Sequence, residues 1–471
     1  MRRALTFTVV LLVVICAPAS AQVPTLSSPF TSSYSVSVLN APAGVPTRFG
    51  GLTLKAGTTD KLLLGGAANA ADGALYQVTV ARDAQGHISG FLGTATRYAD
   101  AAYNDGGVAY GPGNVLFLAR WPVNELGQTK PGSTATDKVI PVEPLGIESS
   151  LVALGFVPPG SPGAGRLKLV SYGGGAWYDA SVKPDGSGTY DLTGVREING
   201  SRLSGGAVGF VYVTAGSARF NRPSLLVSEY SAGEVAAYAV DAAGNPIVST
   251  RRTFITGLDG ADGAFIDPVT GDFLFSTFGG GDHIVVVHGF AAPLPPPVAG
   301  KKVNAQPSGG TVKVELPGKK GFKVLKVGQQ IPVGTTVDTT KGRVTLVTAA
   351  KGAATYQADF YDGVFKVGQA KGSKLTTLTL AAKLACKGSG KAASAAKKRK
   401  KKRRLWGDGH GRFRTKGSFS SATVRGTKWL VQDTCTTTTT TVKRGKVAVR
   451  DFVKKKTVIV KAGKKYVARR R

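Results

Sequence analysis

The hydrophobic residues of this chain fall mainly in short runs, separated by turns rich in glycine, proline and aspartate. Between residues 48 and 289 one pattern returns five times: an apolar run led by glycine, serine or aspartate, a turn, and a more strongly apolar run. The paired runs are 50–54 with 62–64, 105–110 with 115–118, 150–154 with 167–170, 205–210 with 225–227, and 262–266 with 273–275. Beyond the N-terminal segment, no stretch shows a long 3.6-residue period with helix caps. The pattern predicts an all-β fold.

The repeats are spaced at roughly 45 to 57 residues, and third apolar runs follow at 77–80 and 235–240. A unit of three or four short strands at this period is typical of a β-propeller blade, since radial stacking buries both faces of each blade and protects its edges. We therefore predict a five- or six-bladed β-propeller, in which residues 34–38 would close a sixth blade. A pair of β-sandwiches is the alternative.

The pattern changes in the last third of the chain. Apolar residues there alternate with polar ones, often Lys or Arg, as in 343–347 and 446–450, which predicts strands with one buried and one cationic face. Charge follows the same division. Residues 22–300 hold 17 Lys and Arg against 21 Asp and Glu, whereas residues 301–471 hold 42 against 7. Two domains with different roles are expected.

The N-terminus predicts a secretory signal peptide over residues 1–21. Two arginines precede an apolar run of about 13 residues, and Ala19 and Ala21 form an A-x-A cleavage site. Such a run is too short to cross a bilayer, which needs roughly 20 residues, and no later run is long and apolar enough to do so. The mature protein is therefore expected to be secreted and extracytoplasmic, in association with the cell envelope.

A proline-rich linker, residues 291–302, separates the domains expected at 22–290 and 303–471. Once the signal peptide has gone, Cys386 and Cys435 are the remaining cysteines, and an exported protein with two cysteines most often pairs them. Closing a loop of about 50 residues would stabilise the domain by roughly 4 kcal/mol. A reactive thiol pair is the alternative, but the chain has no C-x-x-C motif.

Eight consecutive cations form a polybasic insertion over residues 397–404. They are Lys397, Lys398, Arg399, Lys400, Lys401, Lys402, Arg403 and Arg404. Together with the cationic strand faces they predict a polyanion-binding surface. For an exported protein the expected partners are anionic cell-wall polymers or lipid headgroups, and extracellular nucleic acid is a further candidate. The alternative is a solvated loop without a dedicated partner.

The last repeat of the first domain, residues 260–282, resembles the six-bladed propellers of the gluconolactonase and NHL type. More closely, residues 51–290 resemble uncharacterised secreted bacterial propellers. The gluconolactonase resemblance implies a divalent cation near the propeller axis, held by an Asp, a Glu and an Asn, which polarises a lactone carbonyl and activates water. Asp262 matches the Asp, and Asp105 opens a similar repeat. The repeat that should offer the Asn begins at Leu203 without an amide side chain, and both aspartates could instead cap turns.

Other catalytic motifs are absent from the first domain. It has three histidines, His87 in a turn and His283 and His288 on or beside the strand expected at 284–287, and neither a G-x-S-x-G nor an H-E-x-x-H motif. Its glycine clusters are not followed by a helix, so they favour turns over phosphate binding. The sequence of this domain therefore gives little support for hydrolytic catalysis.

Three stretches of the second domain resemble the FecR-type domain. They are 327–339, with the pattern G-x-x-I-x-x-G, 422–431, which contains A-x-V-x-G-T, and 442–463, which ends in V-K-A-G. The resemblance implies a β-rich, envelope-exposed domain; the membrane helix and the cytoplasmic segment of FecR do not occur here. The run 436–441 of six threonines is expected to be a flexible or edge-strand segment.

These observations favour an exported, non-enzymatic protein. Its propeller would bind a ligand or partner, and its basic FecR-like domain would hold it to anionic surface polymers. A metal-dependent, lactonase-like hydrolase in the propeller is one alternative, and an extracellular polyanion- or DNA-binding protein is another.

Overall fold

The computed structural model describes residues 23–279, 281–325, 328–350, 355–386, 402–424 and 426–471. Within these ranges the chain is almost entirely β-structure, and its helical turns are three-residue 3-10 segments. The all-β prediction is confirmed, and the predicted pattern of two domains appears as a propeller followed by a second sheet. The expected signal peptide, residues 1–21, lies outside the described residues. Across the described ranges no helix is long and apolar enough to span a membrane.

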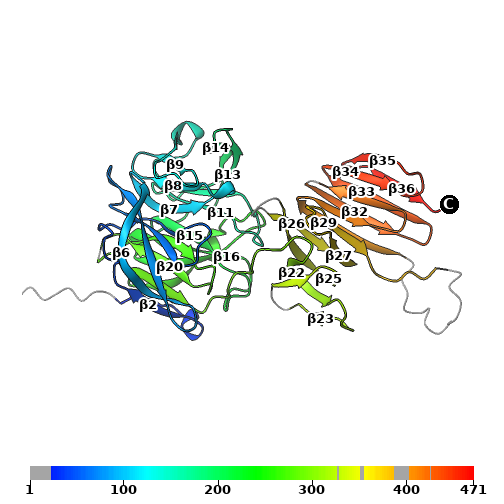
Figure 1. Ribbon diagram of the computed structural model, residues 1–471, viewed down its shortest axis with the longest axis horizontal. Coiled ribbons are helices and arrows are strands. Elements are labelled where there is room, and N and C mark those ends of the chain that lie inside the picture. The colour runs from blue at the N-terminus through cyan, green and yellow to red at the C-terminus, as the bar shows by residue number, and fades with distance from the viewer. Residues whose placement is uncertain (1–22, 280, 326–327, 351–354, 387–401, 425) are drawn as a thin grey trace, which may run out of the picture.

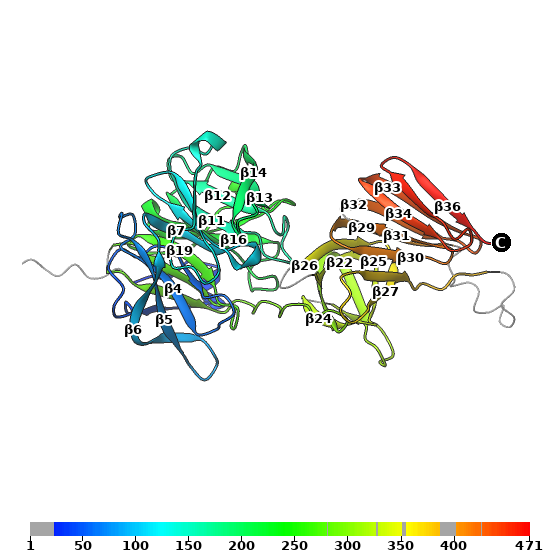
Figure 2. The same cartoon turned by 45° about the horizontal axis from the view of Figure 1, so that its top comes forward.

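The first domain is a ring of five antiparallel blades (Figures 1 and 2). Their strands, from the innermost outwards, are β3 (Leu52–Leu54), β4 (Lys61–Gly66), β5 (Ala74–Arg82) and β6 (Ile88–Asp100) in blade 1; β7 (Asn104–Tyr110), β8 (Leu116–Arg120), β9 (Glu125–Thr129) and β10 (Lys138–Pro141) in blade 2; β11 (Leu151–Phe156), β12 (Leu167–Ser171), β13 (Trp177–Pro184) and β14 (Tyr190–Glu197) in blade 3; β15 (Ala207–Tyr212), β16 (Ser224–Glu229), β17 (Glu234–Ala239) and β18 (Arg252–Thr256) in blade 4; and β19 (Ala261–Ile266), β20 (Phe273–Thr277) and β21 (Ile284–His288) in blade 5. All five predicted pairs of apolar runs are the first two strands of a blade.

The N-terminal part of the domain closes the ring. Strand β2 (Ser35–Leu39) pairs with β21 as the outermost strand of blade 5, and β1 (Thr25–Leu26) pairs with β18 at the edge of blade 4. Residues 34–38 therefore complete the fifth blade instead of closing a sixth, which settles the blade number at five. The ring joins a segment near residue 37 to one near residue 286, so its closure depends on contacts between distant parts of the chain.

Glycines let the inner strands approach one another closely at the axis. A Cβ atom at Gly106 of β7 would clash with the carbonyl oxygen of Val208 and the carboxylate of Asp262, and one at Gly263 of β19 would lie 2.6 Å from the Cα atom of Gly51. Real Cβ atoms do not approach so closely. The starts of the inner strands are thus packed backbone to backbone, and apolar side chains fill the space between neighbouring blades.

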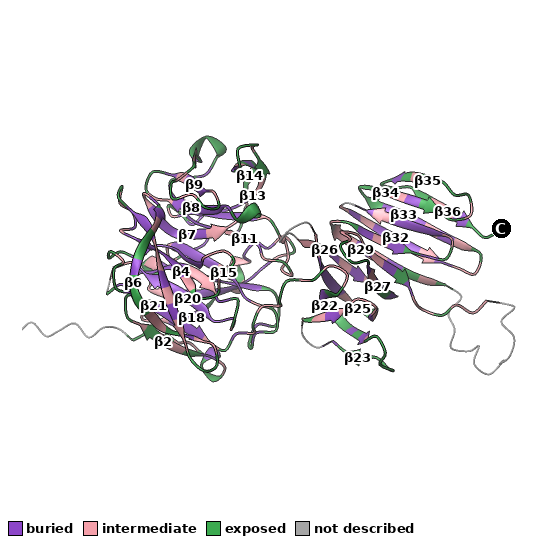
Figure 3. Ribbon diagram, in the orientation of Figure 1, coloured by how far each residue is buried: buried purple, intermediate pink, exposed green. Residues whose placement is uncertain are grey.

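The second domain is one large sheet that folds around a single apolar core. Its strands are β22 (Lys302–Glu315), β23 (Lys323–Val324), β24 (Gln329–Pro332), β25 (Thr336–Ala349), β26 (Thr355–Tyr361), β27 (Val364–Gln369), β28 (Thr376–Leu380), β29 (Arg403–His410), β30 (Phe413–Lys416), β31 (Ser420–Val424), β32 (Thr427–Asp433), β33 (Thr437–Arg444), β34 (Lys446–Asp451), β35 (Thr457–Lys461) and β36 (Lys465–Arg469). Alternation of buried and half-exposed residues along these strands, seen in Figure 3, confirms the predicted period of two. The sheet is nearly closed, because β33 contacts both β34 and β35.

Two details of this sheet bear on the sequence predictions. Cys386, which follows β28, and Cys435, between β32 and β33, form a disulfide, as predicted. The prediction for the threonine run was wrong, because β33 lies inside the sheet between β32 and β36. Its alternate residues Thr438 and Thr440 are fully buried, and the Thr438 hydroxyl donates a hydrogen bond to Asp433.

The proline-rich segment between β21 and β22 is fixed at both ends. Near the propeller, the Ala291 N–H donates to the Ser217 hydroxyl (3.1 Å). Near the second domain, the side-chain amides of Asn304 and Gln330 donate to the Pro295 carbonyl (2.9 and 3.1 Å). The segment therefore holds the second domain against one end of the propeller, as Figures 1 and 2 show.

Candidate functional site

Two carboxyl groups meet at the propeller axis. Asp105 is the second residue of β7 and Asp262 is the second residue of β19, so each lies at the start of an inner strand, as its place before a glycine in the repeat indicated. Their exposed fractions are 4% and 2%. The Asp105 carboxylate accepts a hydrogen bond from the Gly106 N–H (2.7 Å), and the Asp262 carboxylate lies against the same glycine. The structure therefore brings together the two aspartates that the repeat pattern singled out.

Burial makes this pair hard to ionise. Desolvation raises the pKa of Asp105 to about 7, although the Gly106 N–H and the Asn69 amide partly offset it. Desolvation, followed by repulsion from Asp105, raises the pKa of Asp262 well above its usual value. Two adjacent buried carboxylates cannot both be charged without a counter-ion. At neutral pH the pair must therefore hold a proton or a cation.

Oxygen atoms without partners surround the pair. Among the described residues, Oδ1 of Asp262 and Oδ1 of Asn69 are buried and accept no hydrogen bond. Asn69 lies in the turn between β4 and β5 of blade 1 at a positive φ of 65°, a conformation that asparagine tolerates better than most residues. Carboxylate and amide oxygens are the donors that hard divalent cations prefer. Asn69, whose side-chain amide hydrogen-bonds to Asp105, is thus an amide beside the pair that the sequence pattern did not single out.

A glutamate that could complete such a site is already engaged. Glu229, the last residue of β16, lies 2.8 Å from where a Cβ atom of Gly205 would be, near the start of β15. Its carboxylate is fully buried and accepts hydrogen bonds from the Arg251 guanidinium and the Tyr238 hydroxyl. These contacts make Glu229 a structural ion-pair partner in blade 4.

Half-buried aromatic residues border the carboxyl pair. Blades 2 to 5 each place one at or near the turn between their second and third strands; these residues are Trp121, Tyr172, Tyr230 and Phe278. Trp121 and Tyr172 lie 6.5 Å apart by ring centroids, and Tyr230 and Phe278 lie 6.1 Å apart. Burial, and then the charges of Tyr172, Asp262, Asp259 and Asp105, raises the pKa of Tyr230. This end of the axis is therefore an acidic site with an aromatic border.

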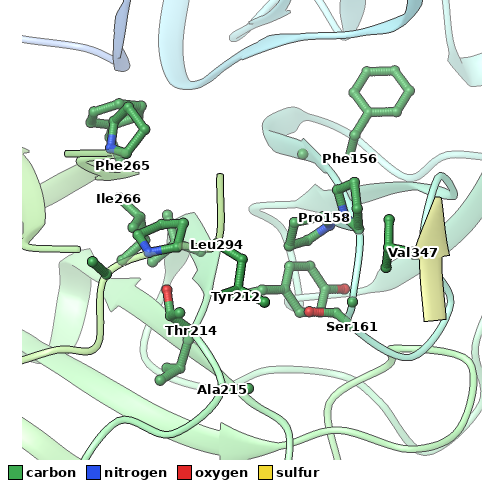
Figure 4. A pocket seen from close by; sticks show the side chains of 18 of the residues that line it. Phe156, Pro158, Ser161, Tyr212, Thr214, Ala215, Phe265, Ile266, Leu294 and Val347 are labelled. Carbon is green, nitrogen blue, oxygen red and sulfur yellow. The ribbon is translucent and has the colours of Figure 1, made fainter. Parts of the chain in front are cut away.

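The other end of the inner strands opens into a cavity of about 870 Å³ (Figure 4). The ends of β7, β11, β15 and β19 form its floor, with Phe156, Phe265 and Ile266 among the apolar side chains. Leu294 of the proline-rich segment and Val347 of β25 complete the wall. Cavities of this size with mostly apolar walls are typical of small-molecule sites.

Contacts between the two domains shape this cavity. The Gly160 N–H donates to Oε1 of Gln357 on β26 (2.7 Å), and Nε2 of Gln357 donates to the Ser161 carbonyl (3.3 Å). Gly160 and Ser161 both line the cavity. Neither domain alone would enclose it, which explains why the repeat pattern of the propeller gave no sign of it.

The polybasic run is only partly described. Lys397 to Lys401 lie outside the described residues, whereas Lys402 is exposed and Arg403 begins β29. The Arg403 guanidinium makes an ion pair with the fully buried Asp433 (2.9 Å), and Arg404 pairs with Asp362 (2.6 Å). The last two cations of the predicted polyanion surface thus have structural partners, which the run of eight charges did not reveal.

A second cationic surface lies at the far end of the second domain. Lys446 and Arg450 of β34 and Lys461 of β35 are exposed on one face, and Lys446 lies directly opposite Lys461 in the register. Like charges at directly opposed positions destabilise a sheet. None of the three makes an ion pair with any residue that the structure describes, and the turn 454–456 adds three exposed lysines. This set, named the β34–β35 face, is open to an external anion.

Comparisons with known proteins give only distant likeness. No protein-family model matches the chain, and no curated protein does. Among solved structures, an auxiliary nutrient binding protein from Bacteroides ovatus has a TM-score of 0.32 and 9% identity, covering 54% of this chain and 76% of its own. The PQQ-bound aldose sugar dehydrogenase from Streptomyces coelicolor has a TM-score of 0.29 and 12% identity, covering 53% and 81%. Virginiamycin B lyase from Staphylococcus aureus has a TM-score of 0.27 and 12% identity, covering 54% and 99%. At these values the activities of those proteins do not transfer to this chain.

Proposed function

We propose that this is an exported, non-enzymatic binding protein, held to anionic polymers of the cell envelope by its second domain. The observation that carries the proposal is the β34–β35 face, where exposed cations stand opposite one another without acidic partners. The described acids of this domain are engaged internally; Asp408, for example, pairs with Lys428 and Arg444. A cationic face of this kind gains free energy when a polyanion covers it. The resemblance of the domain to FecR-type sequences supports an envelope-exposed role.

Neutralising this face should weaken polyanion binding. We expect the variant Lys446→Gln/Arg450→Gln/Lys461→Gln of the mature chain to elute from immobilised polyphosphate at lower salt than the wild type. The slope of log affinity against log salt should fall by about 2 to 3, since each phosphate contact contributes roughly 0.7 to 0.9. A matched control removes three exposed cations of the propeller, Arg97, Lys183 and Arg222.

The two variants have the same net charge, so their comparison separates a local site from a general charge effect. Equal losses in both would contradict the proposal, as would a wild type that ignores both polyphosphate and isolated cell walls at low salt. Tighter binding to duplex DNA than to polyphosphate would instead favour the extracellular DNA-binding alternative.

The propeller's ligand is expected in the 870 Å³ cavity, since its wall combines four inner strands with the second domain. The apolar lining predicts a compact ligand with aromatic or aliphatic groups and few polar atoms. The neutral dye Nile red is a suitable probe, because the cationic domain does not attract it. Thr214→Trp, in a loop that lines the cavity, should abolish most of the dye's fluorescence increase. Thr134→Trp, at an exposed site in blade 2, should leave it unchanged. Equal signals from both variants would refute this assignment.

A metal-dependent, lactonase-like hydrolase is the second candidate function, and the unpartnered oxygens at the axis favour it specifically. Asp105, Asp262 and Asn69 would hold the cation, which when bound would polarise a carbonyl group and activate water. The aromatic residues Tyr172 and Tyr230 would exclude bulk water from that end. If this candidate is right, calcium should bind the wild-type protein and should not bind the Asp262→Asn variant.

A further inference from the structure

The seam where the first and last blades meet holds a cluster of three potential metal ligands. His87 comes from the turn between β5 and β6 of blade 1, Asp272 ends the turn before β20, and His288 ends β21. One ligand atom from each side chain lies within 4.8 Å of the other two. This cluster is separate from the carboxyl pair at the axis. His87 and Asp272 are 185 residues apart in the sequence.

Asp272 is at the centre of the cluster. Its side chain is 1% exposed, and its Oδ2 atom lies 2.6 Å from Nδ1 of His87 and 3.1 Å from Nδ1 of His288. Among the described residues, Oδ1 of Asp272 accepts no hydrogen bond. Nδ1 of His288 is close to Oδ2 of Asp272 but forms no hydrogen bond with it or with any other described residue. A buried carboxylate oxygen without a protein partner is costly, and a bound cation would satisfy it.

The surrounding residues orient the His288 imidazole as metal sites do and hold the turn that carries His87. Nε2 of His288 lies 3.1 Å from the Ser37 hydroxyl on β2, so its Nδ1 atom is the one that faces Asp272. The Asp83 carboxylate accepts a hydrogen bond from the backbone N–H of His87 (2.9 Å), which fixes the turn that carries this ring. In metal sites, a hydrogen bond to the distant ring nitrogen sets the tautomer of a ligating histidine.

The charges near the seam leave Asp272 without a permanent cation. Arg82 is the nearby guanidinium, but it binds Asp267 through two hydrogen bonds (2.7 and 3.1 Å). The two histidines are 31% and 25% exposed, so the cluster can be reached from solvent. Two imidazole nitrogens and a carboxylate, with further positions open to water, are a donor set for divalent transition metals, zinc foremost.

We propose that His87, Asp272 and His288 bind one divalent transition-metal ion, of the zinc class, and that this ion joins blade 1 to blade 5. The ring is closed here by strand pairing between the two ends of the domain. A metal ligated from both blades would stabilise that closure, because binding to the folded state alone adds to its stability. The proposal does not depend on the function proposed for the cavity or for the second domain.

Zinc binding by the full mature chain tests the proposal. After dialysis against a chelator and its removal, calorimetry with zinc chloride should give one site per chain. Thermal unfolding should shift upwards by about 5 °C when zinc is present at 100 times its Kd. Asp272→Asn and His288→Gln should each weaken zinc binding on the order of 100-fold and abolish the shift. His283→Gln, which removes another half-buried histidine of blade 5, should bind zinc like the wild type.

The proposal is overturned if the wild type binds no zinc, in which case the cluster is only a histidine–aspartate hydrogen-bond network. It is equally overturned if zinc binding persists in His87→Gln, because the ion would then lie elsewhere. His87 stands in an exposed turn, so this variant keeps the test decisive even if Asp272→Asn does not fold. Calcium should not replace zinc, which distinguishes this seam from the carboxyl pair at the axis.

Discussion

Replacing Asp262 by asparagine should raise the free energy of unfolding of the propeller at pH 8, and leave it nearly unchanged at pH 4. Asp262 is buried beside Asp105, and both pKa values are raised in the folded protein. At pH 4 both carboxyl groups are protonated in the folded state, and an asparagine side chain resembles a neutral carboxyl group in size and polarity. At pH 8 the folded wild type must either ionise these groups without solvent or hold protons that the unfolded chain releases.

The sign follows from proton binding. An unfolded aspartate has a pKa of about 3.9, whereas Asp105 in the fold has one of about 7. Between these values the folded state binds more protons than the unfolded state, so stability declines as pH rises from about 4 through 7. Urea unfolding of the wild type in a chelator should show this decline. Asp262→Asn should show a much smaller one, because it removes one buried carboxyl group and its repulsion of the other.

Asp259→Asn is the matched control, since Asp259 is an exposed acid three residues before Asp262. It should keep the pH dependence of the wild type. Parallel stability curves for wild type and Asp262→Asn would refute the description of the pair as buried and mutually repelling. Calcium added at pH 8 separates the two candidate functions. If calcium stabilises the wild type and does not stabilise Asp262→Asn, the result supports the hydrolase. If calcium has no effect on either protein, the pair is a proton-holding element of a binding protein.

The sequence pattern predicted the parts of this molecule that depend on local chemistry. Four of the five inner strands begin directly after a glycine or a serine, and β7 has Asp105-Gly106 as its second and third residues. Each precedes a strongly apolar strand, because the first packs at the axis and the second inside the blade. The gluconolactonase resemblance implied a place at the axis for Asp262, and Asp105 was singled out because it opens a similar repeat. The disulfide followed from two cysteines in a chain expected to be exported.

Features that depend on tertiary contacts could not be found in this way. The blade number depends on β2, which pairs with a strand about 250 residues later. Asn69 hydrogen-bonds to Asp105 from a turn of another blade, and the seam brings His87 of blade 1 against Asp272 of blade 5. Arg403 looked like one solvated cation among eight, yet it is the partner of a buried aspartate. In each case the partner is remote in sequence, and no local period records it.

The role of Lys168 also depends on partners that are remote in sequence. Breaking its ion pair with Asp179 is the change for which we expect the largest loss of stability. It stands between leucines in β12, where alternation would place it on a solvent-exposed face, but it is fully buried. Its ammonium group donates to Asp179 of β13 (2.8 Å) and to Asn245 in the turn after β17 (2.7 Å). Asn245 belongs to blade 4, so this network joins blades 3 and 4. Burial lowers the pKa of Lys168, and Asp179 partly restores it.

Asp179→Asn should reduce the free energy of unfolding by about 3–5 kcal/mol, because it leaves a buried ammonium group without its counter-ion. Lys168→Met should cost far less, since methionine fills a similar volume and Asp179 keeps the Arg166 guanidinium at 2.7 Å. In the double variant most of the loss should be recovered. Urea unfolding of the four proteins forms a double-mutant cycle whose coupling energy measures the pair.

Raising the pH gives an independent readout of the same interaction. In Asp179→Asn the pKa of Lys168 should fall further, so the folded state binds fewer protons than the unfolded one near neutral pH. Its stability should therefore rise between about pH 7 and 10, while that of Lys168→Met stays level over this range. If Asp179→Asn and Lys168→Met cost the same, and neither gains stability at high pH, then Lys168 does not depend on Asp179 to keep its charge, and the junction of blades 3 and 4 is held by apolar packing around Trp177 instead.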